Sequence, residues 1–129
     1  MSFGCRANRK HFPNPTEGGI ITPLWELAEA SQKTLRVDPE LIPIPPLARR
    51  VCEVFAIDPL SSIASGFLLI TASASDARSI GEASRQAAIT CVDIGVVVDG
   101  SALVQRSTAS GFETWPRPAM DAFTKAFAA

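Results

Sequence analysis

Residues 20–38 read IITPLWELAEASQKTLRVD, and the spacing of their apolar side chains changes once along the stretch. From Ile20 to Ser31 apolar residues recur every three or four positions, which predicts an amphipathic helix. Pro23 is compatible with this helix only in its first turn. Residues 34–38 then alternate between apolar and polar, which predicts a strand. The stretch therefore indicates a helix followed directly by a strand.

A second helix is predicted over residues 46–56, after a proline-rich connector (41–46) that cannot run through a central strand. The charged side chains of this helix lie outside an apolar stripe. The stripe consists of Leu47, Val51, Val54 and Phe55. Residues 66–72 (GFLLITA) are continuously apolar, which is typical of a strand buried on both faces.

A third helix is predicted over residues 76–87, with Asp76 as its cap. Two apolar runs then flank Asp99-Gly100, a residue pair that favours a type I′ hairpin turn. A last helix is expected over residues 118–127. The inward-facing residues expected in these two helices are Ala77, Ile80, Ala83 and Ala87, and then Met120, Phe123 and Phe127.

The predicted order of elements is α-β-α-β-α-β-β-α, in a chain of 129 residues. Helices that alternate with strands, together with one hairpin, indicate an α+β fold in which helices pack against a mixed sheet. Residues 1–13 have no periodicity and are expected to form an irregular N-terminal arm. The domain itself is expected to cover residues 14–129.

Composition excludes several classes of function. The net charge of −1 and the absence of tyrosine argue against a nucleic-acid partner. The longest apolar run is too short to cross a bilayer, and no signal peptide is recognisable, so a cytoplasmic location is expected and no membrane partner. Three widely spaced cysteines and one histidine suggest no zinc site, no disulfide framework and no His-based catalytic triad.

The first candidate site is the stretch NPTEGG at residues 14–19, just before the first helix. Glycines at a helix start let a ligand approach the backbone N–H groups, and the helix dipole adds positive charge there. Thr16 offers a hydroxyl group to a phosphate or to a metal-bound water. The alternative is a glycine-rich turn that merely enters the helix, since the stretch contains no lysine and is no Walker motif.

The second candidate is the loop DPLSSIASG at residues 58–66, which ends in Ser65-Gly66. Gly66 could admit a ligand at the mouth of the following strand, or could simply allow a tight entry to it. The two tryptophans, Trp25 and Trp115, are expected to serve packing rather than cofactor stacking.

Three segments, taken together, resemble a known family. They are NPTEGGIITPLWELAEAS (14–31), IPIPPLARRVCEVFAIDPLSSIASGFLLITA (42–72) and DIGVVVDG (93–100). In this order and spacing they are similar to the C-terminal domain of the aminoimidazole ribonucleotide (AIR) synthetase superfamily, which includes PurM and HypE. The likeness covers residues 13–127 and is greatest to AIR synthetase-related hydrogenase maturation factors.

The resemblance implies a PurM C-terminal-like fold and an ATP-dependent enzyme of two domains. In such enzymes the N-terminal domain forms a dimer and supplies most ligands of ATP and Mg²⁺. The C-terminal domain closes over the phosphates and helps to form the acceptor site. The N-terminal ATP-binding domain is expected to be absent from this chain, which is then expected to be inactive alone and to meet that domain in cis or in trans. A homodimer is the other partner state that the resemblance allows.

The resemblance implies six nucleotide-binding positions: Thr16, Gly18, Gly19 and Gly66, which match the family motif, and Asn14 and Ser65, which depart from it. Asn14 stands where the family often has aspartate, and Ser65 where HypE-like sequences have glutamate. An amide brings no charge, so weaker metal affinity is expected, and no residue is assigned as a metal ligand or as catalytic. The chain also ends without the cysteine of HypE.

Two functions follow from these observations. The first is the C-terminal domain of a HypE-like, ATP-dependent protein that positions nucleotide phosphates. The second is a non-catalytic interaction or dimerisation module that has kept the fold.

Overall fold

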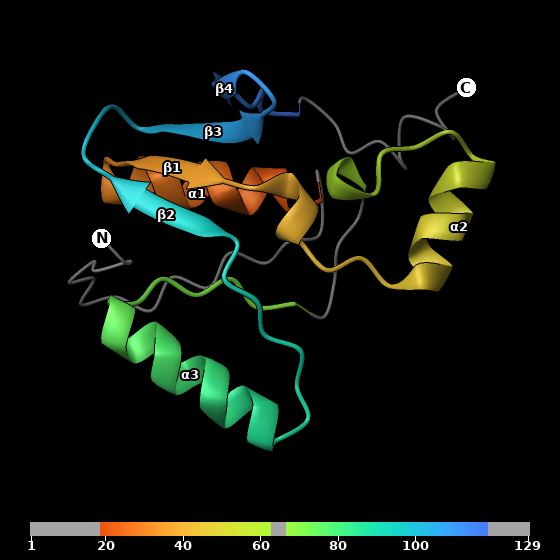
Figure 1. Ribbon diagram of the computed structural model, residues 1–129. Coiled ribbons are helices and arrows are strands. Elements are labelled where there is room, and N and C mark those ends of the chain that lie inside the picture. Colours follow the sequence, from red (N-terminus) through yellow and green to blue (C-terminus); the bar gives the residue numbers. More distant parts are fainter. Residues whose placement is uncertain (1–18, 63–66, 119–129) are drawn as a thin grey trace.

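The computed structural model describes residues 19–62 and 67–118, and Figure 1 shows the arrangement of their elements. The predictions for residues 1–18 and 119–129 concern residues outside this range. They include most of the predicted last helix. In chain order the elements are α1 (Ile21–Ser31), β1 (Thr34–Val37), the 3-10 turn η1 (Pro39–Leu41), α2 (Pro46–Val54), the 3-10 turn η2 (Pro59–Ser61), α3 (Ala74–Gln86), β2 (Gly95–Val98), β3 (Leu103–Thr108) and β4 (Gly111–Thr114).

The four strands form one mixed sheet in the order β2-β1-β3-β4. β1 is antiparallel to β2 and parallel to β3, while β3 and β4 are antiparallel. α1 lies along one face of this sheet, while in the view of Figure 1 α2 lies to the right of the strands and α3 below β2. The expected α+β class, with helices and a mixed sheet, is confirmed.

The core is the apolar layer between α1 and the sheet. Leu24 and Ala28 of α1 are almost fully buried, as are Leu35 and Val37 of β1 and Val104 of β3. Because side chains alternate along a strand, Leu35 and Val37 reach this layer while Arg36 lies on the opposite face. There its guanidinium lies 5.0 Å from the centre of the Phe112 ring.

The tail that follows β4 is fixed to α1 through the two tryptophans. Trp115 is 4% exposed, and its backbone N–H donates to the carbonyl of Val104 at 2.8 Å. The indole Nε1 of Trp25 donates to the carbonyl of Trp115 at 2.9 Å. Arg117 pairs with Glu29 of α1 at 2.6 Å. Both tryptophans therefore serve packing, as the sequence indicated.

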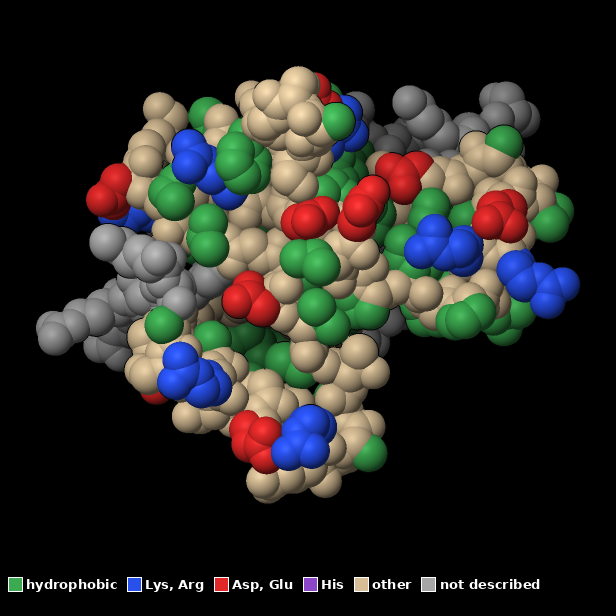
Figure 2. All heavy atoms as spheres, viewed as in Figure 1, with side chains coloured by type: hydrophobic (Ala, Val, Ile, Leu, Met, Phe, Trp, Pro, Cys, Tyr) green, Lys and Arg blue, Asp and Glu red, His purple; other side chains and the backbone are tan. Residues whose placement is uncertain are grey.

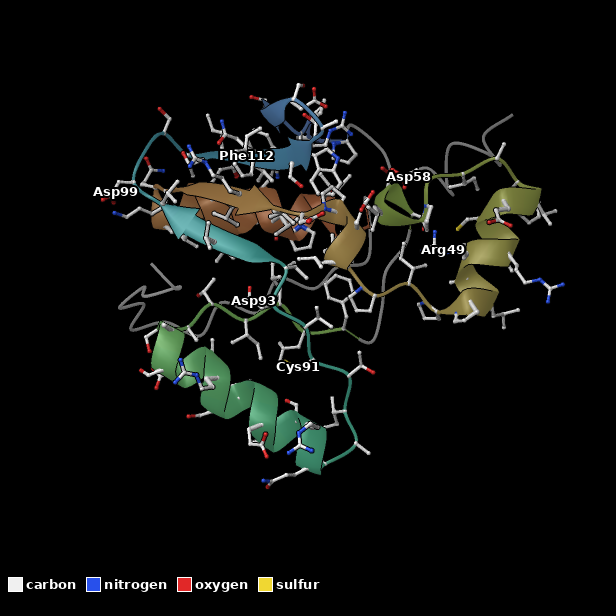
Figure 3. The ribbon with its side chains drawn as sticks, viewed as in Figure 1. Arg49, Asp58, Cys91, Asp93, Asp99 and Phe112 are labelled. Carbon is white, nitrogen blue, oxygen red and sulfur yellow. The ribbon has the colours of Figure 1, made fainter. Side chains whose placement is uncertain are left out.

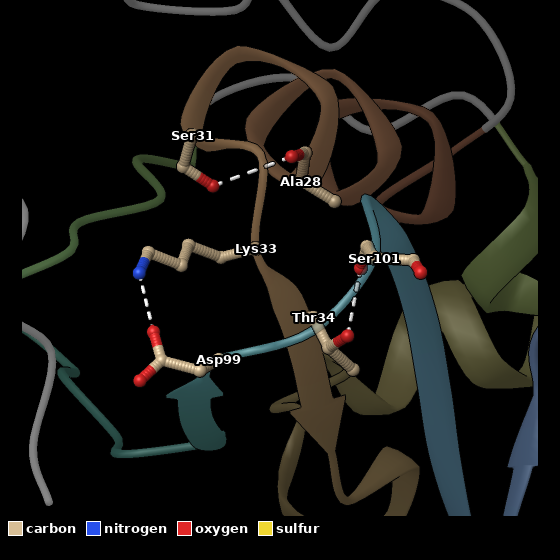
Figure 4. A network of polar contacts seen from close by, with 6 residues as sticks. All are labelled: Ala28, Ser31, Lys33, Thr34, Asp99 and Ser101. Carbon is tan, nitrogen blue, oxygen red and sulfur yellow. Dashed lines mark hydrogen bonds and ion pairs between the residues drawn. The ribbon is translucent and has the colours of Figure 1, made fainter.

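The predicted hairpin around Asp99-Gly100 is wrong, because β1 lies between β2 and β3. The turn instead crosses the start of β1, where Thr34 Oγ1 donates to the carbonyl of Ser101 at 2.7 Å and Lys33 pairs with Asp99 (Figure 4). The pattern of residues 88–107 shows only that two strands are close in sequence. It cannot show that a third strand enters between them. A hairpin is formed instead by β3 and β4, and β4 is not among the strands predicted from the sequence.

The strand predicted over residues 66–72 is also wrong for its described part. Residues 67–72 form no ladder, and Leu68 and Ile70 are 61% and 45% exposed. Phe67 and Leu69 pack partly against the core, so the segment is extended with one face inward. The continuous apolar run suggested burial on both faces, but the described sheet covers only one side of it.

The boundaries of the helices are close to those predicted. The apolar residues of α2 and α3, however, are less buried than predicted. α3 begins earlier than expected, because Ser73 rather than Asp76 is its cap, with Ser73 Oγ accepting from the Asp76 N–H at 3.2 Å. No residue of α3 is buried, and Ala83 and Ala87 are exposed. Within residues 19–62 and 67–118, no helix is long and apolar enough to span a membrane.

Substitution of Leu24 by alanine should strongly destabilise the chain, because Leu24 is 1% exposed in the layer between α1 and the sheet. Loss of a buried leucine costs about 2–5 kcal/mol. The matched control is Leu47→Ala on α2, where the side chain is 73% exposed, and its effect should stay within about 0.5 kcal/mol. Urea unfolding of both variants measures the difference. Equal losses would contradict this account of the core.

The ion pair at the β1 crossing predicts a pH dependence. Hydrogen bonding and charge from Lys33 lower the pKa of Asp99 below its ordinary value. The pair should therefore favour folding at neutral pH, and this contribution should fade as the pH falls through the lowered pKa of Asp99. NMR titration of the carboxyl groups should show Asp99 titrating at lower pH than in Lys33→Met. An unchanged pKa in that variant would contradict the pairing.

Candidate functional site

The structure describes one of the six residues that the sequence assigned to nucleotide binding. That residue is Gly19, immediately before α1. The other five lie outside the described residues, and their roles remain predictions. They are Asn14, Thr16, Gly18, Ser65 and Gly66. The described residues that flank these positions nevertheless show how the two candidate segments are placed.

Gly19 lies directly against the described part of the second candidate segment, residues 58–62. A Cβ atom at Gly19 would lie 2.1 Å from the carbonyl oxygen of Leu60 and 2.5 Å from that of Ser62. The next N–H, that of Ile20, donates to the carbonyl of Leu60 at 3.1 Å. Residues 19–20 and 60–62 therefore touch through their backbones, although forty positions separate them. The structure thus brings Gly19 of the first candidate segment against Leu60 and Ser62 of the second.

Gly19 also has the left-handed backbone, with φ at +61°. This conformation disfavours side chains with a Cβ atom, and the carbonyl groups of η2 leave no room for one. Its lack of a side chain is thus required by packing within the chain. The sequence predicts that the glycine pair admits a ligand. For Gly19 the structure shows a packing role.

The short turn η2 packs against Gly19, and Asp58 is the cap residue of this turn. The Asp58 carboxylate accepts the N–H of Leu60 at 3.0 Å and the hydroxyl of Ser61 at 3.1 Å. Pro59 follows the cap, where the lack of an N–H costs nothing. The Asp-Pro-Leu-Ser sequence thus fixes a turn whose carbonyl groups face Gly19. The sequence contained the capping signal, but not the backbone contact that depends on it.

Ser62 connects this turn to α2. Its side chain is 7% exposed, and its hydroxyl donates to the carbonyl of Pro59 at 2.9 Å. The Sγ of Cys52, the one buried residue of α2, lies 4.0 Å from Ser62 Oγ. The start of α1, η2 and α2 are therefore joined by successive contacts. Figure 3 shows Asp58 on η2 and Arg49 on α2 on the same side of the molecule.

The start of α1 has no acidic side chain in its first turn, and its cap residue, Ile20, offers no side-chain acceptor. The positive end of the helix dipole is thus not neutralised by the side chains of that turn. The hydroxyl groups and N–H groups of the neighbouring candidate residues would add to this potential. An anion site before α1 stays a prediction from the sequence, because residues 14–18 lie outside the described residues.

The other carboxylates have structural partners. Asp58 caps η2, Asp76 lies in the first turn of α3, Asp93 Oδ1 accepts the Gly95 N–H at 3.2 Å and Asp99 pairs with Lys33. Figure 3 labels Asp93 and Asp99 at the two ends of β2. Among residues 19–62 and 67–118, no three potential metal-ligating side chains gather.

Replacing Gly19 by alanine should destabilise the chain by more than about 2 kcal/mol, because the left-handed conformation and the contact with η2 both disfavour a Cβ atom. Gly81→Ala is the matched control, since nothing lies within 4 Å of the added atom in α3. That change should be neutral or stabilise by up to about 1 kcal/mol. Thermal unfolding compares the two. A Gly19→Ala variant as stable as Gly81→Ala would contradict the contact.

In comparisons with known proteins, the chain matches one protein family and is similar in sequence to HypE proteins. The family described as AIR synthase related protein, C-terminal domain, matches residues 14–106. A carbamoyl dehydratase HypE of Cupriavidus necator is 33% identical over 101 residues, or 76% of this chain and 29% of that protein. The HypE of Rhizobium leguminosarum is 39% identical over 56 residues, which are 43% of this chain and 16% of that protein.

Solved structures of hydrogenase maturation proteins have a similar fold. Escherichia coli HypE aligns with a TM-score of 0.75 at 23% identity, over 91% of this chain and 37% of the other. A HypE in complex with ATP aligns at 0.70 with 22% identity, over 85% and 36%. A HypE-HypF complex aligns at 0.68 with 24% identity, over 83% and 36%. The chain thus spans less than two fifths of the length of each of these relatives.

Proposed function

Because the chain belongs to the AIR synthase related protein family through its C-terminal domain, we propose that it closes over the phosphates of a nucleotide held by the preceding domain. The role is positional and electrostatic. Backbone N–H groups and hydroxyl groups would orient the phosphoryl groups, and no side chain of this domain would attack them.

The observation that carries the proposal is the contact between Gly19 and the Leu60–Ser62 backbone. It fixes the ends of two segments that are far apart in the sequence beside the positive end of α1. The candidate residues lie within five positions before Gly19 or within four positions after Ser62. Thr16, Gly18, Ser65 and Gly66 would provide the phosphate contacts. Asn14 would lie beside the metal ion, and its amide would bind this cation more weakly than a carboxylate would.

The nucleotide of the proposal is ATP with Mg²⁺. A HypE among the structural neighbours is in complex with ATP. The proposal assigns the Mg²⁺ ion chiefly to the preceding domain. The complete protein would act in hydrogenase maturation, as its HypE relatives do by name, and would be cytoplasmic. A further protein partner in trans would be consistent with the HypE-HypF complex.

A non-catalytic interaction module is the second candidate, and one observation favours it. The apolar residues of α2 are exposed although the helix is amphipathic. Such a face suits a partner protein whether or not nucleotide is bound. The two functions differ in whether this domain alters nucleotide affinity.

The test is a calorimetric titration with Mg²⁺ and a non-hydrolysable ATP analogue. The titrated protein is the N-terminal part of C. necator HypE, alone and fused in front of the complete 129-residue chain. The fusion should bind the analogue at least about tenfold more tightly, because each charge-assisted hydrogen bond to phosphate contributes about 1.5–3 kcal/mol. Thr16→Val in the fusion should remove most of this gain, because valine keeps the shape and lacks the hydroxyl.

Thr90→Val is the matched control, since Thr90 is exposed on the segment between α3 and β2. It should leave the affinity unchanged. If the fusion binds no better than the N-terminal part alone, the phosphate-closing role is wrong and the interaction module is favoured. Gly19→Val is unsuitable here, because its effect on packing would be confused with an effect on the ligand.

A further inference from the structure

β4 forms one edge of the sheet, and all four of its residues are exposed. In the part of the chain that the structure describes, a strand lies on one side of β4 only. Figure 1 shows β4 at the upper edge of the sheet, and Figure 3 labels Phe112 in this region. At the other edge, only Val96 of β2 is exposed. A free strand edge presents backbone N–H and C=O groups that can pair with another chain.

The hydrogen-bond pattern shows which backbone groups of β4 point outward. The N–H of Trp115 donates to the carbonyl of Val104 at 2.8 Å, which continues the β3–β4 ladder by one pair. In an antiparallel ladder, residue pairs that exchange hydrogen bonds alternate with pairs that do not. Glu113, like Trp115, therefore bonds to β3. The N–H and C=O groups of Phe112 and Thr114 point away from β3, toward the free edge.

The free edge has few of the features that usually prevent pairing. Lysine and proline are common on protected edges, and the sequence of β4, GFET, contains neither. Its one charged side chain, Glu113, pairs with Arg106 of β3 at 2.6 Å. Phe112 is 53% exposed, with the Arg36 guanidinium 5.0 Å from the centre of its ring. Figure 2 shows hydrophobic and basic side chains side by side on the face over β3.

We propose that β4 pairs antiparallel with β4 of a second copy of this chain, so that two sheets join into one continuous sheet. The two-fold axis of this homodimer is perpendicular to the sheet. The inference goes beyond the proposed function and does not depend on nucleotide binding, since none of the candidate phosphate-binding residues belongs to β4.

The sequence of β4 favours one register for this pair. Because the outward groups belong to Phe112 and Thr114, symmetric pairing must bring these positions together. With Phe112 opposite Thr114, the two Glu113 carboxylates would lie directly opposite each other, which is destabilising. With Thr114 opposite itself, Phe112 would face Pro116, which has no N–H to donate. With Phe112 opposite itself, Glu113 faces Gly111, which has no side chain.

The last register is self-complementary, and this property selects a second copy as the partner. The two Phe112 rings lie side by side on one face and form an aromatic cross-strand pair. The Arg36 groups stay apart, because the two rings lie between them. Each ion pair between Arg106 and Glu113 lies on the opposite face and remains intact, since neighbouring side chains of a strand alternate between faces.

The contact is small, and the dimer is therefore weak. β4 has four residues, whereas stable contacts between proteins bury about 800 Å² on each partner. Two short strands bury much less, so the two copies exchange rapidly. The dimer should accordingly be populated only at high protein concentration.

Sedimentation equilibrium of the complete 129-residue chain tests the inference, with a reducing agent present and nucleotide absent. Between about 10 μM and about 1 mM the mean mass should rise from that of a monomer toward that of a dimer. Thr114→Pro should raise the dissociation constant at least about tenfold, because proline removes an N–H that Thr114 donates toward Ser110 of the second copy. This N–H points away from β3, so the fold should survive, which circular dichroism checks.

Thr114→Val is the matched control, because valine keeps the N–H group and is well suited to a strand. It should leave the dissociation constant within about twofold of the original value, since the backbone pairing is unchanged. The inference is overturned if the chain stays monomeric over the whole concentration range, or if the proline and valine variants dimerise equally well.

Disulfide cross-linking tests the register, and it decides the matter if Thr114→Pro fails to fold. The background carries Cys5→Ser and Cys91→Ser, which leaves the buried Cys52. Phe112→Cys places two thiols on opposed residues, whose Cα atoms are about 5.5 Å apart, within reach of a disulfide. In Glu113→Cys, the control, the two Cα atoms are about 8 Å apart, which is too far.

Under a mild oxidant, Phe112→Cys should therefore form covalent dimers at least about tenfold faster than Glu113→Cys. Equal rates in the two variants, or faster cross-linking through residue 113, would overturn the proposed pairing.

Discussion

The packing of α1 on one face of the sheet is the contact on which the rest of the fold depends. Leu24 and Ala28 meet Leu35, Val37 and Val104 in a single apolar layer. A layer of this kind gives stability roughly in proportion to the apolar area that it removes from water. Because one helix lies along the sheet, the layer is thin, and α2 and α3 have no described apolar surface of comparable size to cover. Their exposed faces are a consequence of this arrangement.

The central position of β1 follows from the same contact. The strand directly after α1 must turn back beneath it, and the strands added later can pair only at its two edges. β2 therefore takes one edge and β3 the other, and the Asp99-Gly100 turn has to cross the start of β1. Lys33 and Thr34 hold this crossing by an ion pair and a hydrogen bond. An apparent hairpin in the sequence thus becomes a bridge over a third strand.

Sequence reasoning succeeded where the signal is local and periodic. α1 and β1 are predicted within one residue, because apolar spacing fixes both the type of element and the buried side. It failed at residues 67–72, at the burial of α3 and at the Asp99-Gly100 turn, where the outcome depends on what lies opposite. An apolar run shows that burial would be favourable, but it does not show that a partner is present in the same domain. Leu68 and Ile70 are exposed for this reason.

At the candidate site, too, local sequence patterns could be predicted from, whereas contacts between segments distant in the sequence could not. The sequence identified two loops by their glycines, but their meeting at Gly19 depends on carbonyl groups of Leu60 and Ser62, which no side-chain pattern encodes. The conformational freedom of Gly19 is used in the packing of α1 against η2, so in the proposed function the phosphate contacts are assigned to the residues before it. A rigid seat is useful for that task, because hydrogen-bond donors stabilise an anion best when they need not reorganise. The packing role of Gly19 and the proposed binding role of its neighbours are therefore parts of one arrangement.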